Sequence, residues 1–297
     1  MAKTTIIIPV KDEEDGLEHL LGEYSSSELY DDEEIQFIFV IDGRTSDNSR
    51  EIAGRFSQKI IDQKESHGKG AAIQQAVTEW KKNPTELVIF LDADGSYPFN
   101  SVISVLSTLN EGADIVSGSR FLNNDGKNVP SYRKAGIKIL TKLANTSLEK
   151  NITDSQSGFR GYSNQVIENI TPSESGMGVS NEILIKASKQ GLKIVEVPII
   201  ILYDGDTSTH NPISHGSSVL LSTLKFISIE HPLKFYGIPG FVFLLIGIGF
   251  LIFTVNLFTE TRQILLSSAI IGVGSTIFGI ILIQSSILLY AMVKLMR

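Results

Sequence analysis

The sequence predicts an α/β domain with a mostly parallel, Rossmann-like sheet, followed by a transmembrane hairpin of two helices. Apolar runs rich in Ile, Val and Phe alternate with helix-like segments through the first part of the chain. This alternation is typical of parallel sheets that are covered by helices on both faces. From Ile238 the composition becomes apolar and stays so almost to Arg297, which is typical of membrane-spanning helices.

The elements of the α/β part follow from these runs in order. Strands are expected at Thr4–Val10, Ile35–Ile41, Leu87–Leu91 and Asp114–Ser117. Helices are expected at Ser46–Phe56, Ala71–Lys81 and Phe99–Leu109. Ligands of such sheets bind beyond the carboxyl ends of the strands. The polar residues that follow each strand are therefore expected to converge.

Two charge-free segments, Ile238–Phe258 and Ile264–Val293, predict the hairpin, because each reaches the length of about 20 residues that a spanning helix needs. Thr259–Gln263 joins them, and a buried hairpin of a soluble protein is the alternative. Basic residues flank the hairpin on both sides, at Lys225, Lys234, Lys294 and Arg297. By the positive-inside rule, we expect a multi-pass protein of the cell membrane with a cytoplasmic body and both termini cytoplasmic.

Three parts are expected: a catalytic domain over residues 1–212, an interfacial segment over 213–236 and the hairpin over 237–297. The interfacial assignment rests on the loosely amphipathic stretch Ser217–Glu230, which His231-Pro232 follows. Met1–Thr4 leads directly into the first strand, so no cleavable signal segment is expected.

Composition excludes several classes of function. The chain has 297 residues, no cysteine and a formal net charge of −7. Disulfides and thiolate metal sites are therefore excluded. Nucleic-acid binding is not expected, because affinity for the phosphate backbone needs a basic surface.

An acidic D-x-D motif, Asp92-Ala93-Asp94, closes an apolar strand and opens the turn Gly95–Pro98. Carboxylates two residues apart at a strand end lean to the same side, so both can reach one cation. Mg²⁺ or Mn²⁺ prefers oxygen ligands and keeps positions for phosphate oxygens. The alternative is that both residues only cap a turn or a helix.

Several motifs stand in an order that resembles the inverting family 2 glycosyltransferases, in the branch that makes polyprenyl-phosphate sugars. They are Ile8-Pro9-Val10 with Asp12-Glu13, Val40–Gly43 with Ser46-Asp47, Gly68–Ala72, Asp92–Pro98, Gly118–Phe121, Asp154 with Ser157–Arg160, and Asn211–Gly216. The resemblance covers about Thr4 to Val219. It implies a GT-A nucleotide-sugar-binding fold, a nucleotide-sugar donor, a divalent cation and a lipid phosphate acceptor.

The resemblance also implies which residues bind the donor. Asp92 and Asp94 would hold the metal, and Ser96 stands where related mannose synthases have a glutamine that helps to hold it. Base and ribose would lie against four residues: Pro9, Lys11, Glu13 and Asp42. Lys69 lies between two glycines, where backbone and ammonium can approach a phosphate together, although Gly-Lys-Gly is also a common helix-start turn.

On the acceptor side, Arg120 and Arg133 would clamp the lipid phosphate, which a bidentate guanidinium suits; surface ion pairing is the alternative. Ser157, with Asp154 and Arg160, would order the acceptor loop. Asn211 and His215 would lie where the lipid phosphate emerges. With Asp94, the two arginines form the expected catalytic set.

The expected reaction transfers a sugar, with inversion, to dolichyl or another polyprenyl phosphate for protein N-glycosylation of the archaeal type. The acceptor phosphate is already ionised and is itself the nucleophile, so the site mainly has to stabilise crowded negative charge. UDP-GlcNAc or UDP-glucose is the expected donor and GDP-mannose the alternative. A homo-oligomer that encloses the lipid is a further expectation.

The sequence lacks the motifs that two rival classes of enzyme would carry. A processive polysaccharide synthase would carry Gln-x-x-Arg-Trp, but the single tryptophan is Trp80, in Glu79-Trp80-Lys81. A sugar nucleotidyltransferase would have a glycine-rich loop after the first strand, where Val10–Glu14 stands. A membrane scaffold with an inactive GT-A body is the non-enzyme alternative.

Overall fold

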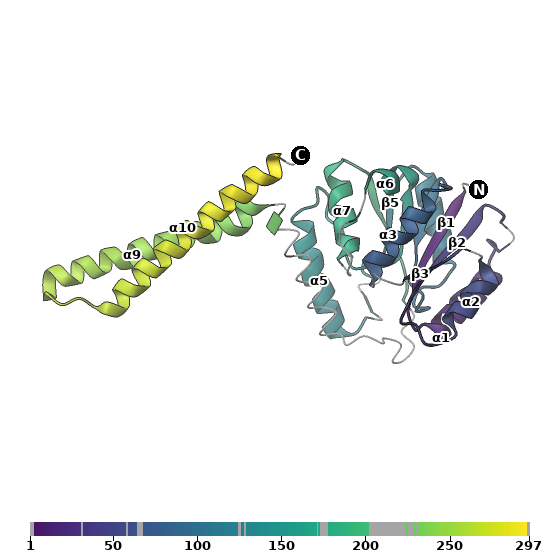
Figure 1. The fold of residues 1–297 in the computed structure, drawn as a ribbon, viewed down its shortest axis with the longest axis horizontal. Helices are drawn as coiled ribbons and strands as arrows, with labels where there is room; N and C mark the ends of the chain where they lie inside the picture. The colour runs from purple at the N-terminus through teal and green to yellow at the C-terminus, as the bar shows by residue number, and fades with distance from the viewer. Residues whose placement is uncertain are drawn as a thin grey trace. The chain divides into compact units, whose positions relative to one another are not determined.

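The structure of the chain is a computed structural model. It describes residues 3–30, 32–57, 59–63, 68–123, 126–127, 129–170, 172, 178–201, 224, 228–229 and 231–295. The chain divides into two compact units, Met1–Thr223 and Leu224–Arg297. Both are drawn in Figure 1. The division falls inside the segment 213–236 that was expected to be interfacial.

The first unit is built on a seven-stranded sheet with the order β3-β2-β1-β4-β6-β5-β7. Its strands are β1 (Thr4–Val10), β2 (Ile35–Asp42), β3 (Ile60–Gln63), β4 (Leu87–Phe90), β5 (Ile115–Ser119), β6 (Arg160–Ser163) and β7 (Ile194–Pro198). Only β6 runs antiparallel to its neighbours β4 and β5. The predicted α/β class with a mostly parallel sheet is thus confirmed.

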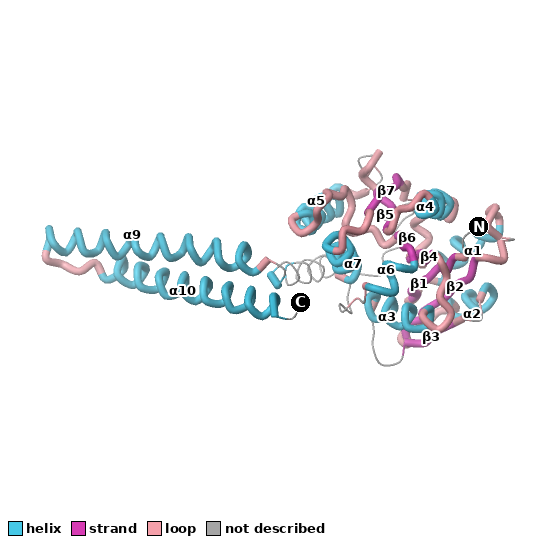
Figure 2. Tube along the Cα trace, turned by 90° about the horizontal axis from the view of Figure 1, so that it is seen from above, coloured by secondary structure: helices cyan, strands magenta, loops and turns pink. Residues whose placement is uncertain are grey.

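Seven helices of the described part surround this sheet: α1 (Glu14–Ser25), α2 (Ser49–Phe56), α3 (Lys69–Trp80), α4 (Ser101–Asn110), α5 (Ser131–Asn145), α6 (Asn164–Asn169) and α7 (Val179–Lys189). Figure 2 shows the strands between α1 and α4 on one side and α3 and α6 on the other. Successive residues of β1, Ile6, Ile7 and Ile8, are all fully buried. A strand that is covered on both faces needs such an uninterrupted apolar run.

The register shows that β1, β2 and β4 end at the same side of the sheet. Val10 of β1 pairs with Ile41 of β2, and Ile7 pairs with Phe90 of β4, all in parallel. The segments that follow these three strands therefore leave the sheet at the same edge. Convergence of their polar residues was the expectation from the sequence.

The second unit contains the one-turn π-helix η1 (Leu233–Gly237) and two long helices, α9 (Ile238–Thr261) and α10 (Leu266–Leu295). The two apolar spans reach mean hydropathies of 2.6 and 2.2, and most of their surface faces outward. They are long and apolar enough to cross a membrane, as predicted. The first span, Leu233–Thr261, is longer than expected at both ends, and the second, Leu266–Lys294, begins two residues later than expected and ends one residue later. The proposed interfacial helix at 217–230 lies almost wholly outside the described residues.

Glycines set the distance between α9 and α10. A Cβ added to Gly240 would come within 3.0 Å of the Gly279 carbonyl oxygen, and one added to Gly279 within 2.7 Å of the Gly240 oxygen. Gly247 and Gly272 form a second close approach further along. Helix pairs in membranes use small residues in this way, because close backbones gain packing contacts.

Candidate functional site

The segment Asp92–Ser96 after β4, called the acidic turn below, is held in place by short polar contacts. The backbone N–H and the hydroxyl of Ser96 donate to Asp94 Oδ1 at 3.0 and 2.6 Å. Lys69 Nζ, from the first residue of α3, donates to Asp92 Oδ1. The Asp92 side chain is 27% exposed and that of Lys69 is 15% exposed. Three predicted site residues, Lys69, Asp92 and Asp94, are thus brought together.

Two glycines allow the start of α1 to touch this turn. A Cβ at Gly16 would lie 2.6 Å from the carbonyl carbon of Asp94. Gly95 has φ +65°, and a Cβ there would lie 3.0 Å from the Gly16 carbonyl oxygen. The backbones meet with no side chain between them. Glu13, immediately before α1, is thereby held beside the two aspartates.

Gly158 closes the site from a third direction. A Cβ added there would overlap Asp92 Oδ2 and lie 2.6 Å from Lys69 Nζ. Glycine is therefore the residue that lets the loop before β6 reach the ion pair. The motif around Gly158 was recognised in the sequence, but this role was missed, because nothing local in Ser-Gly-Phe indicates which side chains it faces.

Burial, and after it crowded negative charge, sets the electrostatics of the turn. Burial and the nearby Asp94, Asp92, Asp47 and Asp12 raise the pKa of Glu13 to about 7. Burial and Asp92 also raise the pKa of Asp94, against the opposing hydrogen bonds from Ser96 and the charge of Lys69. Buried carboxylates that lie close together have raised pKa values, because their charged forms lose hydration and repel one another. This is the environment that a divalent cation stabilises.

The oxygen donors of the turn fit Mg²⁺ or Mn²⁺. Asp92 and Asp94 supply carboxylates, and Asp92 Oδ2 faces the space that a side chain at position 158 would fill. Among the described residues no group of three or more acidic or histidine side chains is arranged to hold a metal. Mg²⁺ in phosphoryl-binding sites commonly takes one or two carboxylates and completes its shell with phosphate oxygens and water. The pair therefore suits a cation that arrives with a diphosphate.

Hydrogen bonds tie the loops after β1 and β2 together. Glu14 N–H donates to Asp47 Oδ2 at 2.9 Å, and the Asn48 side-chain amide donates to Glu14 Oε1 at 2.9 Å. The backbone N–H of Ser46 donates to Asp12 Oδ1 at 2.7 Å. α2 begins at Ser49, three residues after the predicted start at Ser46, because residues 46–48 take part in these contacts between the loops.

Asp42, predicted to bind base or ribose, lies at the end of β2 and is 4% exposed. Arg44 donates to its carboxylate through Nε at 2.9 Å and Nη2 at 2.8 Å. The sequence reading missed this partner, although an arginine two residues after an aspartate was a signal. Pro9 lies within β1 beside Val40, and Lys11 follows that strand as a half-buried residue.

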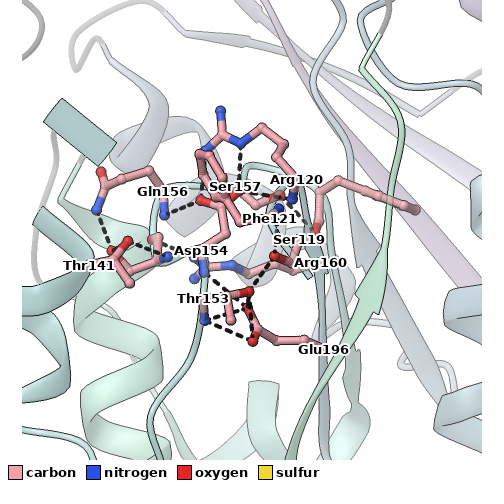
Figure 3. Close-up of polar contacts among 12 residues, drawn as sticks. Ser119, Arg120, Phe121, Thr141, Thr153, Asp154, Gln156, Ser157, Arg160 and Glu196 are labelled. Atoms are coloured by element: carbon pink, nitrogen blue, oxygen red, sulfur yellow. Dashed lines mark hydrogen bonds and ion pairs between the residues drawn. The ribbon is translucent and has the colours of Figure 1, made fainter. Parts of the chain in front are cut away.

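Arg120 lies directly after β5 in a second polar cluster, drawn in Figure 3. Its Nε and Nη2 donate to Asp154 at 2.5 and 2.7 Å. The Asp154 side chain is fully buried, and that of Arg120 is 10% exposed. Burial raises the pKa of the Tyr97 hydroxyl, an effect that nearby Arg120 opposes and Asp92 strengthens. Tyr97 therefore lies within electrostatic range of both the acidic turn and Arg120.

The remaining predicted residues lie in α5, in the loop before β6 and outside the described part of the chain. Arg133 lies in the first turn of α5, with its guanidinium 5.9 Å from the centre of the Tyr132 ring. Ser157 is fully buried before β6, and its hydroxyl donates to the Phe159 carbonyl oxygen at 3.5 Å. Asn211 and His215 lie outside the described residues.

Comparison with known families finds one match in the chain. The model described as Glycosyl transferase family 2 matches residues 5–171. That range starts at the second residue of β1 and runs through β6, and it includes Glu13, Lys69, Asp92 and Asp94.

Curated relatives extend over more of the chain. Glycosyltransferase AglJ of Haloferax volcanii is 25% identical over 285 residues, covering 95% of this chain and 91% of the relative. A dolichyl-phosphate hexose transferase of the same organism is 28% identical over 197 residues, covering 66% and 83%. Dolichol-phosphate mannosyltransferase of Pyrococcus furiosus is 26% identical over 275 residues, covering 86% and 73%.

Among solved structures, glucosyl-3-phosphoglycerate synthase of Mycobacterium tuberculosis in complex with UDP gives a TM-score of 0.60. It is 17% identical, and the match covers 75% of this chain and 79% of that one. Other structures of that synthase contain Mn²⁺ or Mg²⁺ together with UDP. The likeness confirms the predicted GT-A-like fold.

Proposed function

Because the chain belongs to glycosyl transferase family 2, we propose that it transfers a sugar from a nucleotide sugar to dolichyl or another polyprenyl phosphate. The observation that carries the proposal is the convergence of Glu13, Lys69, Asp92 and Asp94 at the carboxyl ends of parallel strands. The dolichyl-phosphate and dolichol-phosphate transferases among the relatives support the acceptor.

The chemistry is an inverting displacement. An acceptor phosphate oxygen forms a bond to the anomeric carbon while the bond from that carbon to the nucleoside diphosphate breaks, and the electron pair leaves with the diphosphate. A bound Mg²⁺ or Mn²⁺ would neutralise charge on the leaving diphosphate. Lys69 stands at the start of α3, where its ammonium and the helix N–H groups suit the same phosphates. Ser96 keeps the Asp94 carboxylate oriented.

Donor selectivity belongs to the loops after β1 and β2. We propose UDP-GlcNAc or UDP-glucose, because the Asp42–Asp47 motif and Asn211–Gly216 resemble those of archaeal enzymes that use these sugars. The paired loops hold Asp42 and Glu13 on rigid strand and helix ends, as base recognition requires. GDP-mannose is the second candidate, and the mannosyltransferase relative favours it.

The two apolar helices support a membrane location for the reaction. We propose that the catalytic unit lies on the cytoplasmic side of the cell membrane, where the acceptor's phosphate meets water. The product would be a lipid-phosphate sugar that serves as a donor for protein N-glycosylation.

The test is transfer from a panel of radiolabelled UDP- and GDP-sugars to dolichyl phosphate by the detergent-solubilised protein, with and without EDTA. Metal-dependent, chloroform-extractable label from one UDP-sugar is expected. Label from GDP-mannose alone would assign the second donor, and no lipid label from any donor would support the inactive scaffold. Asp94→Ala is expected to abolish transfer, and Glu111→Gln, at the exposed end of α4, is the control.

A further inference from the structure

Edge strand β7 carries a carboxylate, Glu196, that reaches the loop holding Arg120 (Figure 3). Glu196 accepts hydrogen bonds from the Thr153 N–H at 2.8 Å and from the Asp154 N–H at 3.0 Å. Asp154 in turn binds Arg120 through two guanidinium nitrogens. Glu196 thus holds the backbone of the residue that fixes the arginine side chain.

A second chain of hydrogen bonds links Glu196, through Thr153, to the residues on both sides of Arg120. The Ser119 and Thr153 hydroxyl oxygens lie 2.6 Å apart, and Phe121 N–H donates to Ser119 Oγ at 3.2 Å. Thr153 Oγ1 also lies 3.0 Å from Glu196 Oε1. An ionised carboxylate only accepts, so the Thr153 hydroxyl donates to Glu196 and the Ser119 hydroxyl must donate to Thr153.

Both chains of hydrogen bonds act on Arg120. Through Asp154, Glu196 sets the plane of the Arg120 guanidinium, and through Thr153 and Ser119 it holds the backbone from which that guanidinium extends. We propose that Glu196 is a positioning residue for Arg120. The proposal rests on the proposed function and on the expectation from the sequence that Arg120 contacts the acceptor phosphate, because a planar guanidinium binds phosphate well only when its orientation is fixed.

Glu196→Gln keeps the size of the side chain but removes its charge and one of its acceptors. In the full-length protein we expect the KM for polyprenyl phosphate to rise about tenfold, while the KM for the donor changes less than about twofold. The NMR signal of Arg120 Nε–H should exchange with solvent about tenfold faster, because its bond to Asp154 opens more often.

Asp114→Asn is the matched control. Asp114 Oδ2 accepts from the Lys193 N–H at 2.8 Å, so it joins the starts of β5 and β7 by the same kind of bond, away from Arg120. This variant should leave acceptor KM and Arg120 exchange unchanged, even if its melting temperature falls as much as that of Glu196→Gln.

A third comparison uses Arg120→Lys, in which the orientation that Glu196 sets is already lost. Adding Glu196→Gln to it should raise the acceptor KM little further, because the two residues act in one unit. An unchanged Arg120 exchange rate in Glu196→Gln, or equal changes in Asp114→Asn, would overturn the proposal. Absence of transfer to any lipid phosphate by the wild type would contradict the proposed function alone, because the exchange measurement needs no substrate.

Discussion

Protonation of Glu13, beside the acidic turn, makes the stability of the fold depend on pH. Its pKa of about 7 stands above its ordinary value of 4.5, so between these values the folded chain holds a proton that the unfolded chain has released. The stability that the protonated Glu13 contributes is therefore fully present below about pH 4.5 and is lost as the pH rises through about 7.

Replacement of this carboxyl by an amide gives the first prediction. Without metal, Glu13→Gln should melt close to the wild type at about pH 5 and about 2–4 °C above it at about pH 8, once solvent screening is allowed for. Thermal unfolding followed by tryptophan fluorescence checks this. Glu111→Gln is the control, and a gain of equal size at both pH values would contradict the role of Glu13.

Gly158 gives the second prediction at the residue scale. A methyl group there collides with the Asp92 carboxylate, so Gly158→Ala should reduce kcat/KM by about a hundredfold by displacing a group that contacts the diphosphate. Gly22, in α1, has nothing within 4 Å of an added Cβ, and Gly22→Ala should leave kcat/KM unchanged. Equal activity of the two variants would show that the loop before β6 does not need to approach Asp92.

At the scale of elements, strands formed by wholly apolar runs were predictable even when short, such as the four-residue β4, and short strands with polar residues were not. β1, β2, β4 and the two long helices follow from composition alone. β3 and β6 have only four residues each, and β6, which begins with a buried arginine, has no apolar periodicity. Its place between β4 and β5 is decided by tertiary pairing, which local sequence does not display.

The candidate site divides in the same way. Asp92 and Lys69 were singled out because a strand end and a glycine-flanked turn are visible in a sequence, and Glu13 was singled out through the family resemblance. Glu196 was missed, although an acidic residue between Val195 and Val197 was a signal for a specific partner. The partner itself, more than forty residues earlier at Thr153 and Asp154, becomes visible only when β7 is placed beside β5.

The hairpin offers a paired test of helix packing. A Cβ at Gly247 would lie 2.5 Å from the Thr276 backbone nitrogen, whereas one at Gly249 meets nothing within 4 Å. Gly247→Ala should therefore lower the melting temperature in detergent by several degrees, and Gly249→Ala should not. Size-exclusion chromatography after heating reads out both variants. Equal loss in both would mean that the glycines do not set the helix spacing.

At the scale of the whole molecule, an acidic chain must gather negatively charged substrates. The net charge is −7, so a cation is expected to control nucleotide binding. Mn²⁺ and UDP together, at about a hundred times their dissociation constant, should stabilise the catalytic unit by about 2.7 kcal/mol, and EDTA should remove that gain. Asp92→Asn should remove it too, whereas Asp114→Asn should retain it. A UDP-induced shift that persists in EDTA would contradict metal-dependent binding.

The contact between Gly16 and Gly95 has a consequence for engineering. No side chain separates the start of α1 from the acidic turn, so the two backbones pack directly against each other. A change in the backbone of one segment therefore requires a matching change in the other. A chimera that takes residues 11–16 from a relative with another base preference would carry a backbone shaped for that relative's own turn. The two segments form a single cassette, and donor specificity should be transferable only when residues 92–96 are exchanged along with them.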